Sequence, residues 1–467
     1  MSSSANPGRR PDPRSWVLPP GPYNEIVRTY FVHNFGCRAT QADGAALEAM
    51  LAAKGMDAAA SRSAADLVIL NTCTVTSSAD DDVRQAIRRV HRENPQARIL
   101  VTGCYAQRAP HELAVLPGVE WVVGNSHKTR IPELVSIGAN DRVSSPAGPT
   151  PYHGNVHVGD IFEQRDFLSA PVGDAAGDRT RPNLKIQDGC NNRCSFCIIP
   201  FVRGRSRSMP ATMVVEQVRD LARRYREVVL SGINLGRWGR EPGSTMRLAD
   251  LVRMLLAQTE IERLRLSSVE PMDFSDDLLG LMEESPRVAP HVHAPLQSGS
   301  DRMLRLMHRK YRPRHYADRI QKARRLMPDA AIGADVMVGF PGETDPDFEE
   351  SRAFIASLPF TYLHVFTYSE RPGTPAASSP DSVSMPVRKE RNRVLRELAA
   401  ARNLEFRRGM IGRTLSAVTL HEPGMALSGN YLKIHLSATR PANLLADIKI
   451  AGIFRDGLYE SGAGPVE

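Results

Sequence analysis

The sequence of 467 residues lacks several features that mark other classes of protein. It contains no run of eighteen apolar residues, so no stretch predicts a membrane-spanning helix. The first 22 residues are polar and rich in Pro, Ser and Arg, without the apolar segment of a secretory signal. Internal repeats and coiled-coil heptads are also missing. These absences favour a cytoplasmic protein with a disordered tail over 1–22, and the length allows two to four domains.

Cysteine is scarce: the chain has six cysteines, and all of them precede residue 200. An even number is compatible with three disulfides. In an intracellular enzyme of this length, however, cysteines point to metal binding instead. None is left over for incidental packing. The six residues are Cys37, Cys73, Cys104, Cys190, Cys194 and Cys197.

The densest cysteine pattern is C-N-N-R-C-S-F-C, which places Cys190, Cys194 and Cys197 at spacings of four and three. Three thiols on one loop hold three irons of a 4Fe–4S cubane and leave the fourth iron without a protein ligand. A zinc site usually has four ligands in two separated pairs, and no fourth Cys or His lies close by. A disulfide would leave one thiol unpaired. The pattern therefore predicts an iron–sulfur cluster with one open iron.

Residues 23–138 alternate strand and helix patterns, and we interpret them as one domain. The alternation predicts an α/β fold with a doubly wound parallel sheet and helices on both faces. The expected strands are 28–35, 66–71, 98–103 and 119–124, with helical stretches over 40–54 and through residue 92.

The other three cysteines follow strands of this predicted sheet. Cys37 follows the first strand, Cys73 the second and Cys104 the third. In an open α/β sheet the loops after the carboxyl ends of the strands form the ligand crevice, so we expect these thiols to meet at one edge. Each cysteine alone is well explained as a small buried hydrophobe. Three in equivalent loops instead favour a second three-thiolate cluster, again with an open iron.

Residues 139–180 are rich in Gly, Pro and Asp and predict a linker between domains. A second β/α alternation over 181–408 then predicts a central partial (β/α)6 barrel, whose chemistry would sit at the carboxyl ends of its strands. Expected helices include 213–225 and 347–358. The expected strands are 184–187, 227–231, 263–268, 291–296, 332–338 and 362–368.

The end of the chain differs in character from the rest. Residues 385–408 predict a strongly basic helix, which is explained equally well by a solvated face or by contact with RNA. Residues 409–467 contain short alternating segments that predict a small β module. The formal net charge is +8, and most of the basic residues are arginine, whose planar forks suit phosphates and stacked bases.

Taken together, the chain resembles the methylthiotransferases of the radical S-adenosylmethionine (SAM) superfamily, over about residues 26–455. The resemblance implies an amino-terminal cluster domain, a radical SAM core and a carboxyl-terminal TRAM-like module that holds RNA, although the module here departs from the strongest TRAM patterns. The matching segments are N-F-G-C-R-A-T-Q, N-T-C-T-V-T, T-G-C-Y-A-Q, D-G-C-N-N-R-C-S-F-C-I-I-P, G-F-P-G-E-T and Y-S-E-R-P-G-T-P-A.

Within that family, T-C-T-V-T and T-G-C-Y-A-Q resemble most the branch that acts on N6-threonylcarbamoyladenosine beside the tRNA anticodon. One alternative is the branch that modifies isopentenyladenosine. Another is methylthiolation of an aspartate in a ribosomal protein, against which the basic helix argues. An alternative from another class is a non-catalytic iron–sulfur RNA-binding protein, which the open-iron spacing disfavours.

The resemblance also implies the reaction and its partners. One SAM molecule would methylate a sulfur carried on the auxiliary cluster, and another would be cleaved at the second cluster to a radical that activates C2 of the adenine. The implied cofactors are two 4Fe–4S clusters and SAM. The implied partners are the anticodon stem-loop of tRNA and an electron donor such as flavodoxin or ferredoxin. A monomer is expected.

Four residues are suggested by the same resemblance as SAM contacts. Glu270 would meet the ribose hydroxyls or the methionyl ammonium, and Arg309 would bind the methionyl carboxylate bidentately. Gln297 offers both a donor and an acceptor, and Asp335 would face the ribose. Each also has a structural explanation, for example Glu270 as a turn residue at a strand end or Asp335 as the partner of a buried arginine.

Overall fold

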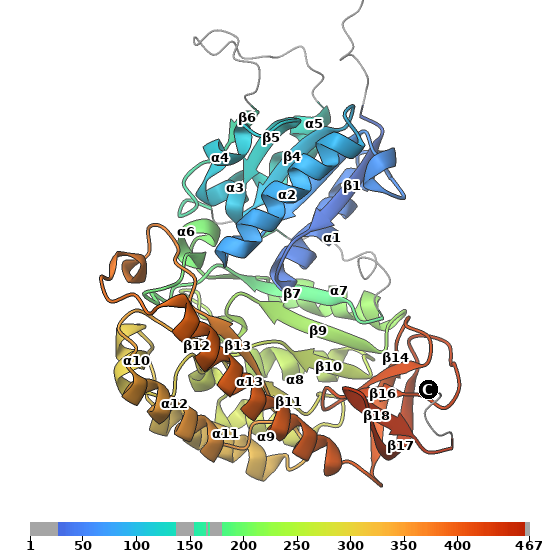
Figure 1. Cartoon of the computed structure of the whole chain (residues 1–467). Helices are drawn as coiled ribbons and strands as arrows, with labels where there is room; N and C mark the ends of the chain where they lie inside the picture. The colour runs from blue at the N-terminus through green and yellow to red at the C-terminus, as the bar shows by residue number, and fades with distance from the viewer. Residues whose placement is uncertain (1–26, 137–153, 165–166, 169–179, 463–467) are drawn as a thin grey trace, which may run out of the picture.

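Figure 1 shows the computed structural model, which describes residues 27–136, 154–164, 167–168 and 180–462. An amino-terminal sheet domain lies above a larger core, and a small β-barrel lies beside the core (Figure 1). The predicted tail over 1–22 and most of the predicted linker over 139–180 fall outside the described residues. Within them, no helix is both long and apolar enough to span a membrane.

The amino-terminal domain contains a six-stranded sheet in which all strands are parallel, in the order β2-β1-β3-β4-β5-β6. This confirms the predicted α/β sheet. The strands are β1 (Thr29–Asn34), β2 (Asp57–Ala58), β3 (Leu67–Thr72), β4 (Arg98–Gly103), β5 (Val119–Gly124) and β6 (Asn155–His157).

Both faces of this sheet are covered, because successive side chains of a strand point to opposite sides. In β3, Leu67 and Ile69 join one apolar cluster while Val68 and Leu70 join another. Helices α1 (Arg38–Ala52) and α5 (Ile131–Ser136) supply the first cluster. The second cluster is supplied by α2 (Ser77–Glu93), α3 (Cys104–Arg108) and α4 (Pro110–Ala114), and the domain is therefore doubly wound, as predicted.

The core is built on six parallel strands that form a partial barrel, as predicted. Strand hydrogen bonding is continuous within β10-β9-β7 and within β11-β12-β13, and the bridge Leu264↔Val288 lies between the two groups. A two-residue strand, β8 (Arg207–Ser208), adds to the edge of the first group. The six strands are β7 (Asn183–Asp188), β9 (Glu227–Gly232), β10 (Arg263–Leu266), β11 (His291–His293), β12 (Ala331–Val338) and β13 (Tyr362–Thr367).

The barrel strands separate apolar from polar residues by their alternation. Apolar residues such as Val228, Leu230 and Leu266 belong to the large core cluster on the outer, helix-covered face. Residues of the opposite parity, among them Glu227 and Arg265, face the concave side. The outer helices are α7 (Ala211–Ala222), α8 (Leu248–Gln258), α9 (Asp276–Glu284), α11 (Pro313–Leu326), α12 (Asp345–Ser357) and α13 (Met385–Arg408).

The carboxyl-terminal module is a closed five-stranded barrel, which confirms the predicted small β module. It packs against the beginning of the core strands, where Arg263 donates to Ser416 Oγ at 2.6 Å and Arg265 donates to the Gly429 carbonyl at 2.9 Å. The strands are β14 (Thr414–Thr419), β15 (Met425–Ser428), β16 (Lys433–His435), β17 (Leu445–Phe454) and β18 (Gly457–Glu460).

The structure also contains strands that the sequence patterns did not reveal. The most informative is β6, a three-residue strand inside the stretch predicted as a linker, which pairs with β5. The other strands that were missed, β2, β8, β15 and β18, have two to four residues each. Runs this short carry no usable periodicity, because a two-residue alternation needs about four residues to be seen.

Candidate functional site

The thiols of Cys190, Cys194 and Cys197 lie in the loop between β7 and α6 (Ile199–Arg203). The loop begins at Gly189, whose φ of +69° requires glycine, and a Cβ there would stand 2.0 Å from the Arg205 carbonyl oxygen. Ser195 joins the loop to α10 (Asp301–Leu306) by donating from Oγ to the Leu306 carbonyl at 2.7 Å.

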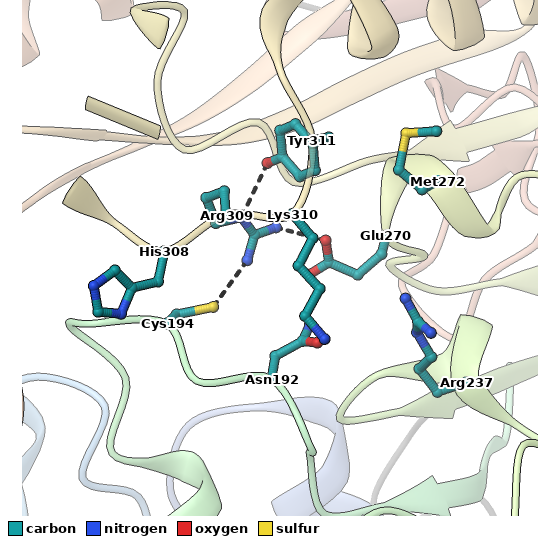
Figure 2. A pocket seen from close by; sticks show the side chains of 9 residues that line it. All are labelled: Asn192, Cys194, Arg237, Glu270, Met272, His308, Arg309, Lys310 and Tyr311. Carbon is teal, nitrogen blue, oxygen red and sulfur yellow. Dashed lines mark hydrogen bonds and ion pairs between the residues drawn. The ribbon is translucent and has the colours of Figure 1, made fainter. Parts of the chain in front are cut away.

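This loop borders a pocket that contains two of the four suggested SAM contacts. Arg309 Nη1 donates to Cys194 Sγ at 3.2 Å, and its Nη2 lies 2.6 Å from Glu270 Oε2 (Figure 2). Its Nε donates to the Tyr311 hydroxyl at 3.1 Å. A guanidinium and a carboxylate are thus held next to a cluster thiol. The pocket is lined by Asn192, Cys194, Arg237, Glu270, Met272, His308, Arg309, Lys310 and Tyr311.

The surroundings of these thiols suit a bound metal cluster. Burial raises the pKa of Cys197 to about 12, and the charges of Cys194 and Cys190 act in the same direction. Three thiolates therefore require a nearby positive charge, which iron ions supply. Hydrogen-bond donors already face Cys190 Sγ, from the Asn192 backbone at 3.4 Å and from Asn234 Nδ2 at 3.8 Å. Such donors to sulfur are typical around iron–sulfur clusters.

The other two suggested contacts, Gln297 and Asp335, do not line this pocket. Gln297 has a φ of +67°, and its backbone N–H donates to the Asp335 carbonyl at 2.8 Å. The Asp335 carboxylate lies 3.1 Å from His293 Nε2 and 3.2 Å from His364 Nδ1. Its partners are thus two histidines and not the buried arginine considered from the sequence, so a contact with SAM stays a prediction for both residues.

The remaining thiols lie together at the carboxyl ends of the strands of the amino-terminal sheet. Cys37 directly precedes α1, Cys73 follows β3, and Cys104 begins α3. Gly36, with a φ of +84°, packs so closely that a Cβ would stand 2.5 Å from Cys73 Cβ. Burial and the charges of Cys104 and Cys37 raise the pKa of Cys73 to about 12. This trio can hold a cluster by the same charge argument, with access from the exposed Cys37 side.

Arg203, which the sequence patterns did not single out, reaches from the core to this second trio. It is 1% exposed, and its Nε donates to Cys104 Sγ at 3.3 Å. Its two other nitrogens bind Asp188 Oδ1 and Asp43 Oδ2, each at 3.0 Å. Asp43 belongs to α1, whereas Asp188 and Arg203 flank the loop of the first trio. One side chain therefore connects both cysteine trios.

Two buried lysines complete the ionic network around Arg203. Lys128 Nζ lies 3.0 Å from Asp43, and Lys185 Nζ lies 2.9 Å from Asp188 and also binds Asp43. Opposite charges removed from water are tolerated only when they are paired in this way. Burial alone would raise the pKa of Asp43, but these cations hold this pKa well below its usual range. The network is contributed by both domains, so it fixes one trio relative to the other.

A second ionic contact ties the segment Y-S-E-R-P-G-T-P-A to the loop after Cys73. Arg371 Nη1 lies 2.8 Å from Asp80 Oδ2 and donates to the Thr74 carbonyl at 3.0 Å. Arg108 binds the same Asp80 oxygen at 3.0 Å. All these groups except Arg108 are almost fully buried. This segment therefore holds the core against the part of the amino-terminal domain that carries the second trio.

Two protein families match the parts of the chain that contain the cysteine trios. Residues 184–355 match the Radical SAM superfamily, and residues 29–124 match a group described as uncharacterized protein family UPF0004. These ranges contain the first and the second cysteine trio, respectively.

The chain is similar to curated proteins over most of its length. It is 38% identical to the threonylcarbamoyladenosine tRNA methylthiotransferase MtaB of Bacillus subtilis, covering 78% of this chain and 79% of the relative. It is 36% identical to the MtaB of Aquifex aeolicus, covering 89% of this chain and 98% of the relative. It is also 34% identical to the tRNA-2-methylthio-N(6)-dimethylallyladenosine synthase of Thermobifida fusca, covering 85% of this chain and 79% of the relative.

Among solved structures, the radical S-adenosylmethionine methyltransferase TsrM from Kitasatospora setae matches with a TM-score of 0.57. The identity is 17%, and the match covers 75% of each chain. At this identity the likeness supports the fold alone, and it agrees with the partial barrel described above.

Proposed function

The chain belongs to the radical SAM methylthiotransferase family, and we propose that it inserts a methylthio group at C2 of N6-threonylcarbamoyladenosine next to the anticodon of tRNA. The observation that carries the proposal is the pair of cysteine trios, which a buried ionic network joins through Arg203. A binding protein has no use for two such trios at a fixed separation. The relatives named MtaB, which span most of the chain, support the choice of nucleoside.

The residues of both trios fit 4Fe–4S clusters, because each trio gathers three thiols, one of which has a raised pKa (Cys73 and Cys197) and one of which accepts from an arginine (Cys104 and Cys194). When bound, the clusters supply the electron that cleaves SAM and the sulfur that is transferred. The protein residues bind and orient. We propose that Arg309 holds the methionyl carboxylate of SAM and that Glu270 accepts from its ammonium group, which is supported by their contact in the pocket beside Cys194.

The proposed partners follow from the same role. Helix α13 exposes Lys389 and Arg396 beside Arg393, but Arg393 is already paired with Glu390 and Glu397. The helix therefore offers only part of its formal charge to a tRNA backbone. We further propose a flavodoxin or ferredoxin as electron donor, a monomeric enzyme and a cytoplasmic location, where tRNA is modified.

The alternative substrate is an adenosine with an isopentenyl-type group, because the relative from Thermobifida fusca is 34% identical. The test is mass spectrometry of tRNA nucleosides from cells that lack this protein. We expect the methylthio form of threonylcarbamoyladenosine to disappear while its precursor accumulates. Loss of a different methylthiolated nucleoside, with this one intact, would contradict the assignment. Complementation with the Cys194→Ala variant is the control, because it removes a cluster ligand and should fail to restore the product.

A further inference from the structure

The concave face of the core contains a polar cluster that is separate from the pocket of Glu270 and Arg309. His293 in β11, Asp335 in β12 and His364 in β13 lie on three neighbouring strands, and Asp335 pairs directly with His364 in the strand register. One carboxylate oxygen, Asp335 Oδ1, lies 3.1 Å from His293 Nε2 and 3.2 Å from His364 Nδ1. The apolar side chains of these strands face the opposite way, into the core.

The protonation of this cluster leaves one imidazole nitrogen available. Burial alone would raise the pKa of Asp335, but the hydrogen bonds from the two histidines hold this pKa well below its usual range, so the carboxylate is charged. A carboxylate only accepts hydrogen bonds, and His364 Nδ1–H therefore donates to it. The Nε2 atom of His364 has no hydrogen-bond partner within the described part of the chain. The side chain is 52% exposed, so this atom is available to a ligand.

A second polar group enters the same region from the amino-terminal domain. Arg38 follows Cys37, and its Nη2 lies 3.5 Å from the hydroxyl of Tyr431. Tyr431 stacks on His291 at 4.7 Å between ring centroids, and His291 in turn binds the hydroxyl of Tyr362 at 2.7 Å. No described carboxylate forms an ion pair with Arg38. A guanidinium without an acidic partner, in a partly enclosed place, is suited to an anionic ligand.

These two groups are linked by a chain of aromatic contacts. The Tyr362 hydroxyl contacts His293 Nδ1 at 2.9 Å, and its ring lies 5.4 Å from that of His364. Tyr362 therefore bridges the Arg38 side to the histidine side. The chain begins at Arg38, one residue after a thiol of the second trio, and it ends on the three strands that carry His293, Asp335 and His364. In adenine the carbon that bears N6 is two ring bonds from C2, so the N6 substituent lies close to the carbon that is proposed to be modified.

We propose that Arg38 binds the carboxylate of the substituent on N6 of the substrate adenosine, that His364 Nε2 accepts a hydrogen bond from the hydroxyl or the N–H of that substituent, and that Asp335 and His293 orient His364. The inference rests on the proposed function and names the residues that recognise its substrate. An apolar isopentenyl group would leave Arg38 and His364 partly desolvated without partners, which disfavours its binding. A threonylcarbamoyl group supplies a carboxylate, a hydroxyl and a carbamoyl N–H to the same side chains.

The test measures both binding and methylthiolation of anticodon stem-loops by the fully reconstituted enzyme, supplied with SAM and a reductant for the second readout. Three RNAs are compared, carrying threonylcarbamoyladenosine, its methyl ester or isopentenyladenosine. We expect the native enzyme to prefer the free carboxylate over the ester by about 10- to 100-fold, as one or two charge-assisted hydrogen bonds give. Arg38→Gln should reduce that preference, whereas His364→Leu should weaken binding of the acid and the ester alike, because the hydroxyl and the N–H that His364 would contact are present in both. Arg89→Gln, which removes an exposed charge from α2 of the same domain, is the matched control and should keep the native preference.

The outcomes separate the two proposals. If the native enzyme methylthiolates only the isopentenyl RNA, the proposed function is wrong. If it acts on threonylcarbamoyladenosine but Arg38→Gln still distinguishes acid from ester and His364→Leu still binds both as the native enzyme does, the function stands and the recognition residues lie elsewhere. A stoichiometric metal other than iron that is lost in His364→Leu would also overturn direct contact. Iron content is measured for every variant, and if Arg38→Gln loses iron, His364→Leu alone decides the question.

Discussion

Replacement of Arg203 by methionine tests how the two cysteine trios are held together. The change keeps most of the side-chain length but removes the charge at a position that is 1% exposed. It deletes two ion pairs of 3.0 Å, to Asp43 and Asp188, and the hydrogen bond to Cys104 Sγ. Removal of one partner from a buried pair costs about 3–5 kcal/mol, because a charge is left without compensation.

The remaining cations reduce that cost. Lys128 and Lys185 still pair with Asp43, and Lys185 still pairs with Asp188. We therefore expect a loss near the lower limit, about 3 kcal/mol in the free energy of unfolding of the metal-free protein. Urea unfolding followed by circular dichroism and tryptophan fluorescence measures it. The control is Arg62→Met, which breaks an exposed pair with Glu93 and should cost less than about 1 kcal/mol.

The same variant has a redox effect that a purely structural residue would not produce. Arg203 places a positive charge and a hydrogen bond on a sulfur of the second trio. Both favour the more reduced, more negative form of a bound cluster, so Arg203→Met should lower its reduction potential. Anaerobic redox titration followed by electron paramagnetic resonance measures that potential. An unchanged potential, together with a stability loss no larger than that of Arg62→Met, would refute the reasoning.

Three further predictions concern the pocket, the thiol geometry and acid stability. Glu270→Gln should weaken SAM binding about tenfold, because it removes the negative charge beside Arg309. Calorimetry measures the affinity, and the iron content of the variant should equal that of the native protein. An unchanged affinity would place SAM elsewhere. Gly36→Ala should reduce the iron content of the second trio, because the φ of +84° at this residue and the 2.5 Å approach to Cys73 Cβ exclude a methyl group. Gly55→Ala is the control: this glycine also has a positive φ, but it has open space around it, so the iron content should not change. The pKa values of Asp43 and Asp188 are held below their usual range. The contribution of these two carboxylates to the stability of the folded protein is therefore fully present above about pH 4 and is lost as the pH falls through their folded pKa values. Acid unfolding of Arg203→Met should begin at a higher pH than acid unfolding of the native protein.

Much of the architecture could be predicted because strand order and strand ends are local properties of the sequence. β4 and β5 begin and end where the patterns placed them, and α13 does too. The positions of Cys37, Cys73 and Cys104 followed from the parallel sheet, since Cys73 and Cys104 come directly after β3 and β4 and Cys37 lies three residues beyond the end of β1. Glu270 and Arg309, which were suggested together, do lie together at 2.6 Å.

What could not be predicted depends on contacts between distant segments. Arg203 and Asp43 are 160 residues apart, and no pattern announces that they pair. Asp335 was grouped with Glu270 by the resemblance to radical SAM enzymes, but the position along the chain does not tell how deep in the barrel a side chain lies. Strand parity could have placed Asp335 with His293 and His364 on the concave face, since the three alternate with apolar residues.

The central claim is that this chain holds two separate clusters, each bound by three thiols, and the most direct test is to delete one trio. Iron quantification and electron paramagnetic resonance would be measured on the variant with Cys190, Cys194 and Cys197 all replaced by alanine, after anaerobic reconstitution. We expect about half of the native iron and the signal of one remaining 4Fe–4S cluster. A variant without any iron, or with zinc at the remaining trio, would contradict the account.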